Sequence, residues 1–191
     1  MQDLMTHRLI LHPLTEAEAT AVIRAGVRSP GYPSAANIEA AADFLTIHRF
    51  RGNPHPFGTY EIRLRDSGRP VGTAGFNRPL DEDGMTTIRY EVAESAQGLG
   101  YATEAARALL KIAHLKGARM IRGSAHRDNV ASQKVMEGAG MVFSFADDHE
   151  RFYSTDWENQ SEAPSAESLG SATPGIGTGA AVSTRPRSRQ R

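Results

Sequence analysis

The stretch from 87 to 116 places a strand, a glycine-containing loop and a helix in direct succession. Apolar and polar residues alternate across 86–93, which is the pattern of a strand with two different faces. The apolar positions of that alternation are Ile88, Tyr90 and Val92. From Ala102 onward, apolar residues recur at helical spacing as far as Gly117, which predicts a helix that ends there. Any fold proposed for this chain must therefore accommodate a strand that turns through glycines into a long helix.

The loop at 97–102 reads Gln-Gly-Leu-Gly-Tyr-Ala. Two glycines before a helix let the backbone turn tightly and bring free N–H groups close to a bound anion, although they can also serve a turn alone. A dinucleotide-binding fingerprint would need a third glycine where this chain has Thr103, and the chain contains no phosphate loop of the G-x-x-x-x-G-K-[ST] type. The spacing indicates a phosphate cradle of another kind.

The pattern Gln97, Gly100 and Ala102 after a strand resembles the acetyl-coenzyme A pyrophosphate loop of the GNAT superfamily of N-acetyltransferases. The fuller string from Tyr90 to Ala105 is similar to the RimJ/RimL branch, which acetylates protein N-termini and, in many relatives, small amines. A second phrase, N-x-x-S-x-x-V at 129–135 followed by Gly-Met, resembles that family's other signature. The resemblance covers about 8–156 and implies acetyl-CoA as the cofactor.

Composition limits the classes of partner. The 191 residues suit one domain, and 22 basic residues balance 22 acidic ones, so no overall field attracts nucleic acid or an anionic membrane. No cysteine is present, which excludes a thiol nucleophile, and no cysteine-based metal site is possible. The chain shows neither a secretory signal nor a transmembrane run, so we expect a cytoplasmic protein. We also expect a monomer or a homodimer and no bound metal.

The resemblance implies an α/β (α+β) class, the GNAT fold: a mixed, mostly antiparallel sheet of six or seven strands with about four helices on both faces. Besides the central helix, we expect helices over 16–25, 35–49 and 130–137. We expect strands over 6–13, 58–64, 70–77, 86–93, 119–125, 141–146 and 150–155. The acetyltransferase domain should span 6–157, and 158–191, rich in Ser, Ala, Gly, Thr and Pro, should be a disordered tail.

The resemblance implies a set of cofactor-binding residues. They are Val92, Ala93, Gln97, Gly98, Leu99, Gly100, Tyr101, Ala102, Thr103, Asn129 and Ser132. The backbone of 99–103 should hold the pyrophosphate, and the main chain of Val92 should meet the pantetheine arm near the thioester. Val92 can equally be a core strand residue, and Asn129 and Ser132 occupy positions where such residues cap helices for structural reasons alone.

Glu91 and Ser132 are the candidate catalytic residues. Glu91 lies inside the strand before the loop, where partial burial would raise its pKa toward that of a useful base. It could instead be a solvent-facing residue paired with Arg89 or Arg122, and His126 is a second candidate base. The resemblance brings the Ser132 hydroxyl near the cofactor sulfur. Other GNAT branches place a tyrosine acid on that helix, and this chain has none between 102 and 152.

We therefore predict an N-acetyltransferase that moves the acetyl group of acetyl-CoA directly to a primary amine, either a protein or peptide N-terminus or a small molecule. A non-catalytic acyl-CoA sensor or interaction module on the same fold is the alternative. The acceptor walls, 26–57 and 141–157, carry few motifs. Their neighbourhood includes aromatic residues that could line a cleft or fill the core: Phe44, Phe57, Phe76, Phe152 and Tyr153.

Overall fold

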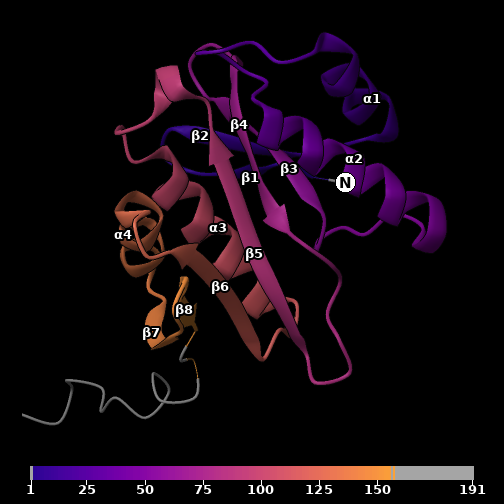
Figure 1. Cartoon of the computed structure of the whole chain (residues 1–191). Coiled ribbons are helices and arrows are strands. Elements are labelled where there is room, and N and C mark those ends of the chain that lie inside the picture. Colours follow the sequence, from indigo (N-terminus) through magenta and orange to yellow (C-terminus); the bar gives the residue numbers. More distant parts are fainter. Residues whose placement is uncertain (1, 156, 158–191) are drawn as a thin grey trace, which may run out of the picture. The chain divides into compact units, whose positions relative to one another are not determined.

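The computed structural model describes residues 2–155 and residue 157, so the tail expected at 158–191 lies outside the described residues. Within these residues, eight strands form one sheet in the order β1-β2-β3-β4-β5-β6-β8-β7, and four α-helices pack on it (Figure 1). The strands are β1 (Leu4–Met5), β2 (Leu9–Pro13), β3 (Thr59–Leu64), β4 (Pro70–Phe76), β5 (Met85–Val92), β6 (Met120–His126), β7 (Val142–Ala146) and β8 (Glu150–Ser154). The helices are α1 (Glu16–Ala25), α2 (Ala35–Arg51), α3 (Tyr101–Leu115) and α4 (Val130–Ala139).

The predicted class is confirmed, because the sheet is mixed and β5–β6 is the one parallel pair among the strands of the described residues. Helix α1 has the predicted bounds, and α2 runs two residues past its predicted end. The eighth strand, β1, pairs with β2 through only two residues. A two-residue strand is too short for an alternation to reveal, so the sequence suggested a single strand over 6–13.

Helices cover both faces of the sheet. Helix α3 buries an apolar stripe against β2, β4 and β5, formed by Ala105, Ala106, Leu109, Leu110 and Ala113. Helix α4 lies beside α3 on the same face. Helices α1 and α2 lie on the other face, where Leu14, Val22 and Phe44 form a second, smaller core (Figure 1). Apolar burial of this kind is the main favourable contribution to folding.

Strands β5 and β6 separate along their length. They pair only where Met85–Thr87 of β5 meets 120–122 of β6, and beyond that point Figure 1 shows them diverging. On its other edge, β5 bonds to β4: the Asn77 N–H donates to the Thr87 carbonyl and the Ala93 N–H to the Val71 carbonyl. Because antiparallel hydrogen bonds alternate, the main-chain groups of residues 88, 90 and 92 point toward the gap left by β6.

Candidate active site

The glycine loop ends in a left-handed turn that opens α3. Gly100 is the residue before the helix, with φ 78° and ψ 8°, and Gly98 also has a positive φ of 75°. Only glycine adopts this region without strain. No side chain in the described chain caps the first turn of α3. The first N–H groups of the helix are therefore available to an anion, and the helix dipole favours negative charge at that end.

The N-terminal segment holds the loop in place from outside. The Arg8 guanidinium donates to the Leu99 carbonyl at 2.8 Å and to the Glu104 carboxylate at 2.7 Å, and it lies 4.8 Å from the centre of the Tyr101 ring. Thr6 donates to the same carboxylate at 2.6 Å. Burial acts to raise the pKa of Glu104, but the hydrogen bonds from Thr6 and Arg8 outweigh it and lower the pKa overall.

A cavity of about 620 Å³ lies between this loop, β5 and α4. Its walls bring together most of the predicted site: Glu91, Val92, Gln97, Gly98, Gly100, Tyr101, Ala102, Thr103, Asn129 and Ser132. Two predicted residues are not part of the walls. The Ala93 N–H bonds to the Val71 carbonyl within the sheet, and the Leu99 side chain is 54% exposed while its carbonyl accepts from Arg8. Gln97 ties the loop to the strand, since its amide donates to the Val92 carbonyl at 3.0 Å.

A tyrosine that the sequence analysis did not single out lies beside Ser132. The Tyr90 hydroxyl is 2.9 Å from the Ser132 Oγ and donates to the Ser132 carbonyl at 3.0 Å. Burial raises the pKa of Tyr90, although the Ser132 hydrogen bond opposes this, so the hydroxyl keeps its proton near neutral pH. The only signal in the sequence was that Tyr90 and Val92 share one face of β5.

The residues at the start of helix α4 take part in a helix cap and also line the cavity. The Asn129 side chain accepts from the Ser132 N–H at 3.0 Å, so Asn129 does cap the helix. Both residues also line the cavity. The cap uses the Asn129 oxygen and leaves its amide nitrogen unused among the hydrogen bonds of the described residues, so capping and a contact to a ligand are compatible.

The Glu91 side chain projects from the face of β5 that is opposite to Tyr90, toward α2. It is half-buried, and burial raises its pKa. The alternative in which it pairs with Arg89 or Arg122 is not found in the described part of the chain, because Arg89 bonds to Asp43 at 2.6 Å. His126, the second candidate base, is exposed, accepts from the Asp128 N–H and lines none of the cavities described here.

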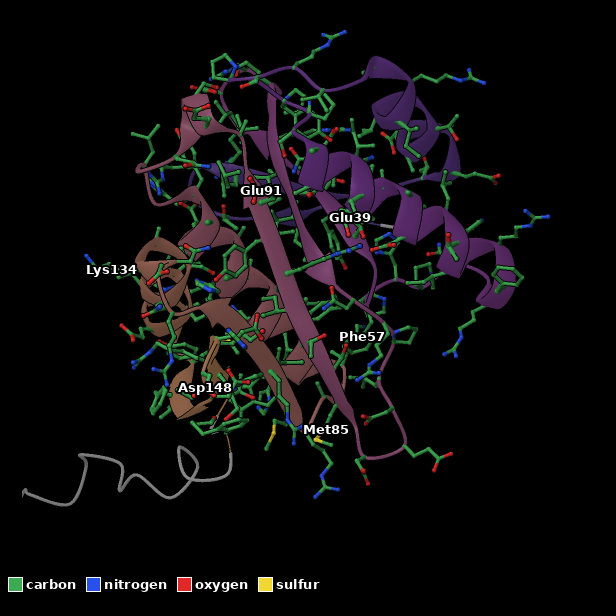
Figure 2. All side chains as sticks on the ribbon, in the orientation of Figure 1. Glu39, Phe57, Met85, Glu91, Lys134 and Asp148 are labelled. Atoms are coloured by element: carbon green, nitrogen blue, oxygen red, sulfur yellow. The ribbon has the colours of Figure 1, made fainter. Side chains whose placement is uncertain are left out.

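Two further cavities meet the first one at Tyr90. The smaller, about 210 Å³, lies between α2 and β4–β5 and has Glu39 and Glu91 in its walls. In Figure 2, Glu39 lies on the side of α2 that is turned toward β5. The larger, about 720 Å³, lies where β5 and β6 diverge and is closed by β7 and β8. Since Tyr90 belongs to all three walls, the three spaces share one boundary residue.

Most aromatic residues named above fill the core. Phe44, Phe57, Phe76 and Tyr153 are buried, whereas Phe152 remains partly exposed and faces the 720 Å³ cavity. Among residues 2–155 and 157, no three histidine, aspartate or glutamate side chains gather as a metal site would require. No helix in this same part of the chain has both the length and the apolar character needed to cross a bilayer.

Comparison with known proteins identifies relatives of this arrangement. The family model described as Acetyltransferase (GNAT) domain matches residues 8–142. No curated protein sequence matches the chain. An acetyltransferase from Agrobacterium tumefaciens str. C58 has a similar structure, with a TM-score of 0.60 and 24% identity, over 82% of this chain and 95% of that chain.

Two similar structures contain ligands. RimL, a ribosomal L7/L12 alpha-N-protein acetyltransferase in complex with coenzyme A, has a TM-score of 0.60 and 18% identity, over 80% of this chain and 97% of that chain. The microcin C7 self immunity acetyltransferase MccE, in complex with acetyl-CoA and AMP, has a TM-score of 0.57 and 14% identity, over 78% of this chain and 93% of that chain. At these identities the likeness concerns the fold.

Proposed function

Because the chain belongs to the GNAT acetyltransferase family, we propose that it transfers the acetyl group of acetyl-CoA directly to a primary amine. The acceptor is a protein or peptide N-terminus or a small molecule. Structural likeness to RimL, together with the string from Tyr90 to Ala105, supports a RimJ/RimL-like enzyme. The proposal includes a cytoplasmic location, no nucleic-acid or membrane partner, and a monomer or homodimer.

One observation carries this proposal: the uncapped N-terminus of α3 and the open edge of β5 line the same 620 Å³ cavity. The first offers N–H groups for a diphosphate, and the second offers the main chain of Val92 for an extended amide-bearing arm. A coenzyme A molecule has both parts in that order. The residues present therefore fit acetyl-CoA, with Asn129 and Ser132 on the side of the cavity opposite Val92.

Bound acetyl-CoA supplies an activated acetyl group and a thiolate leaving group. In the proposed reaction a C–N bond forms to the amine and the C–S bond breaks, so the amine must lose a proton and the sulfur must gain one. In this proposal Glu91 takes the amine's proton, directly or through a water, and its raised pKa supports the role because it makes Glu91 a stronger base than an exposed carboxylate. No cysteine is available for a covalent relay, which supports direct transfer.

The sulfur's partner is the Tyr90–Ser132 hydroxyl pair. With its pKa raised, Tyr90 stays protonated. When its one hydroxyl proton turns from the Ser132 carbonyl to the Ser132 Oγ, the Ser132 hydroxyl can donate its own proton in a hydrogen bond to the developing negative charge. This pair supplies on β5 the phenol that helix α4 lacks. Ser132 is thus the residue that touches the reacting atoms, and Tyr90 orients its hydroxyl.

Thiol release with a panel of amines tests the proposal. Acetyl-CoA, the protein and each amine are mixed, and free coenzyme A is measured against a reaction without amine. Amine-dependent release supports the enzyme. Tight binding of acetyl-CoA with no release from any amine would instead favour the alternative, a non-catalytic acyl-CoA sensor or interaction module, because the cradle would be intact in both.

A further inference from the structure

The 720 Å³ cavity has a one-sided charge. Among the described residues in its walls, Arg89 and Arg122 are the charged ones, and none of the others carries a carboxylate. Arg89 is already neutralised, since it bonds to Asp43 at 2.6 Å and to the Ala40 carbonyl at 3.2 Å. None of the hydrogen bonds or ion pairs among the described residues uses the Arg122 guanidinium. Within residues 2–155 and 157, Arg122 therefore gives this cavity a positive charge that no carboxylate compensates.

The cavity also carries an aromatic wall beside Arg122. Phe145 of β7 stacks on Phe152 of β8, with ring centres 4.4 Å apart and planes 13° apart, and Phe145 is 57% exposed. Arg122 and Phe152 lie on the same face of the sheet, because Arg122 pairs with Ser154 and its neighbour Ser124 pairs with Phe152. Exposed stacked rings next to a guanidinium suit a ligand with an apolar part and an anionic part.

The opposite charge lies at the other end of the same sheet face. Glu39 and Glu91 line the 210 Å³ cavity, which shares Arg89 and Tyr90 with the larger one. Arg122 pairs with Thr87 across β5 and β6, and Glu91 is four residues farther along β5. Four residues at about 3.3 Å each and one strand spacing of about 4.8 Å put the two Cα atoms roughly 14 Å apart. Side chains extended toward each other would leave a gap of a length that about three peptide residues span.

We propose that the acceptor is an amine that also carries a carboxylate, with the amine at Glu91 and the carboxylate on Arg122. A short peptide with a free carboxyl group, or an N-terminal segment with an early acidic residue, has this form. A polyamine does not, because its second cation would meet the positive charge of Arg122, and none of the described residues in the cavity walls offers it a carboxylate. This inference rests on the proposed function, and Arg122 is its specificity-determining residue.

The test uses the tripeptide Ala-Ala-Phe and its C-terminal amide, which differ in the carboxylate alone. Calorimetry on the protein saturated with coenzyme A measures the binding of each, and thiol release measures KM and kcat separately. The wild type should favour the acid by about 10-fold or more, as a charge-assisted hydrogen bond predicts. In Arg122→Gln the two peptides should bind alike, with a raised KM for the acid and an unchanged kcat. Arg122→Glu should favour the amide.

Arg119→Gln is the matched control, because Arg119 is also an exposed arginine next to the start of β6 but lines none of the three cavities. It should keep the acid preference. Equal binding of acid and amide to the wild type, or an equal effect of the two variants, would overturn the inference while amine-dependent thiol release kept the acetyltransferase proposal. An Arg122-dependent binding preference without thiol release from any amine would keep Arg122 as the carboxylate-binding residue of this cavity and overturn the acetyltransferase proposal.

Discussion

Replacing Gly100 with alanine tests the cradle, provided that the strain of a left-handed residue is separated from the loss of a binding surface. Gly117 offers the matched position, because it has φ 86° just beyond the other end of α3 and an added Cβ there meets no atom within 4 Å. At Gly100 the added Cβ would lie 3.4 Å from the Arg8 guanidinium, which secures the loop. Both variants carry the same backbone strain, but only one alters the loop.

The stability cost should be the same for both. Forcing alanine into the left-handed region costs about 1–2 kcal/mol. Each 1 kcal/mol lowers Tm by roughly 2–4 °C in a chain of this size. The two variants should differ in their affinity for acetyl-CoA. Losing one hydrogen bond to an ionised phosphate costs about 1.5–3 kcal/mol, so Gly100→Ala should bind acetyl-CoA about 10- to 100-fold more weakly, and Gly117→Ala as the wild type does.

The assay combines thermal unfolding without ligand and calorimetric titration with acetyl-CoA, at one salt concentration because the diphosphate contact is electrostatic. If Gly100→Ala lost stability but kept its affinity, the phosphate would not lie on this loop. If Gly117→Ala lost affinity as well, the effect would come from the stability of α3, and the cradle assignment would lose its support.

The remaining predictions concern catalysis, the pH dependence of stability and the tail. Glu91→Gln should lower turnover by roughly 100-fold and remove the acidic limb of the pH profile, while initial rates of the wild type should give intersecting and not parallel double-reciprocal lines. Burial raises the pKa of Glu91, so its contribution to stability is complete below its unfolded pKa of 4.5 and is lost as pH rises through the folded value. Glu91→Gln should accordingly gain stability relative to the wild type between pH 4 and pH 8, and a constant difference would contradict this. Ser132→Ala should lower turnover per folded molecule. Tyr90→Phe should also lower turnover, with little change in acetyl-CoA affinity. If either variant had the specific activity of the wild type, the replaced residue would have a structural role alone. Deleting 159–191 should leave Tm within about 2 °C, and a larger drop would mean that the tail packs on the domain.

Local sequence patterns determined where the strand, the loop and the helix around the cofactor cavity begin and end. The alternation in β5, the two glycines and the apolar stripe of α3 each depend on residues within one or two turns of one another, so the sequence alone located the strand, the loop and the helix that line the cofactor cavity. The cap at Asn129 is local for the same reason. Backbone geometry and short-range hydrogen bonds decide such features, and they are visible in any window of about ten residues.

The tertiary structure decided which side chains from distant parts of the sequence contact these elements. Arg8 reaches Glu104 across 96 residues, Tyr90 reaches Ser132 across 42, and both contacts depend on how strands and helices pack. Sequence spacing carries no record of such pairs, so the sequence predicted no role for Tyr90 and left a pairing of Glu91 with Arg89 or Arg122 open, which the described residues do not form. The position of Arg122 is also a tertiary feature. It lies in a cavity wall because β6 diverges from β5, and there it pairs with no carboxylate of the described residues.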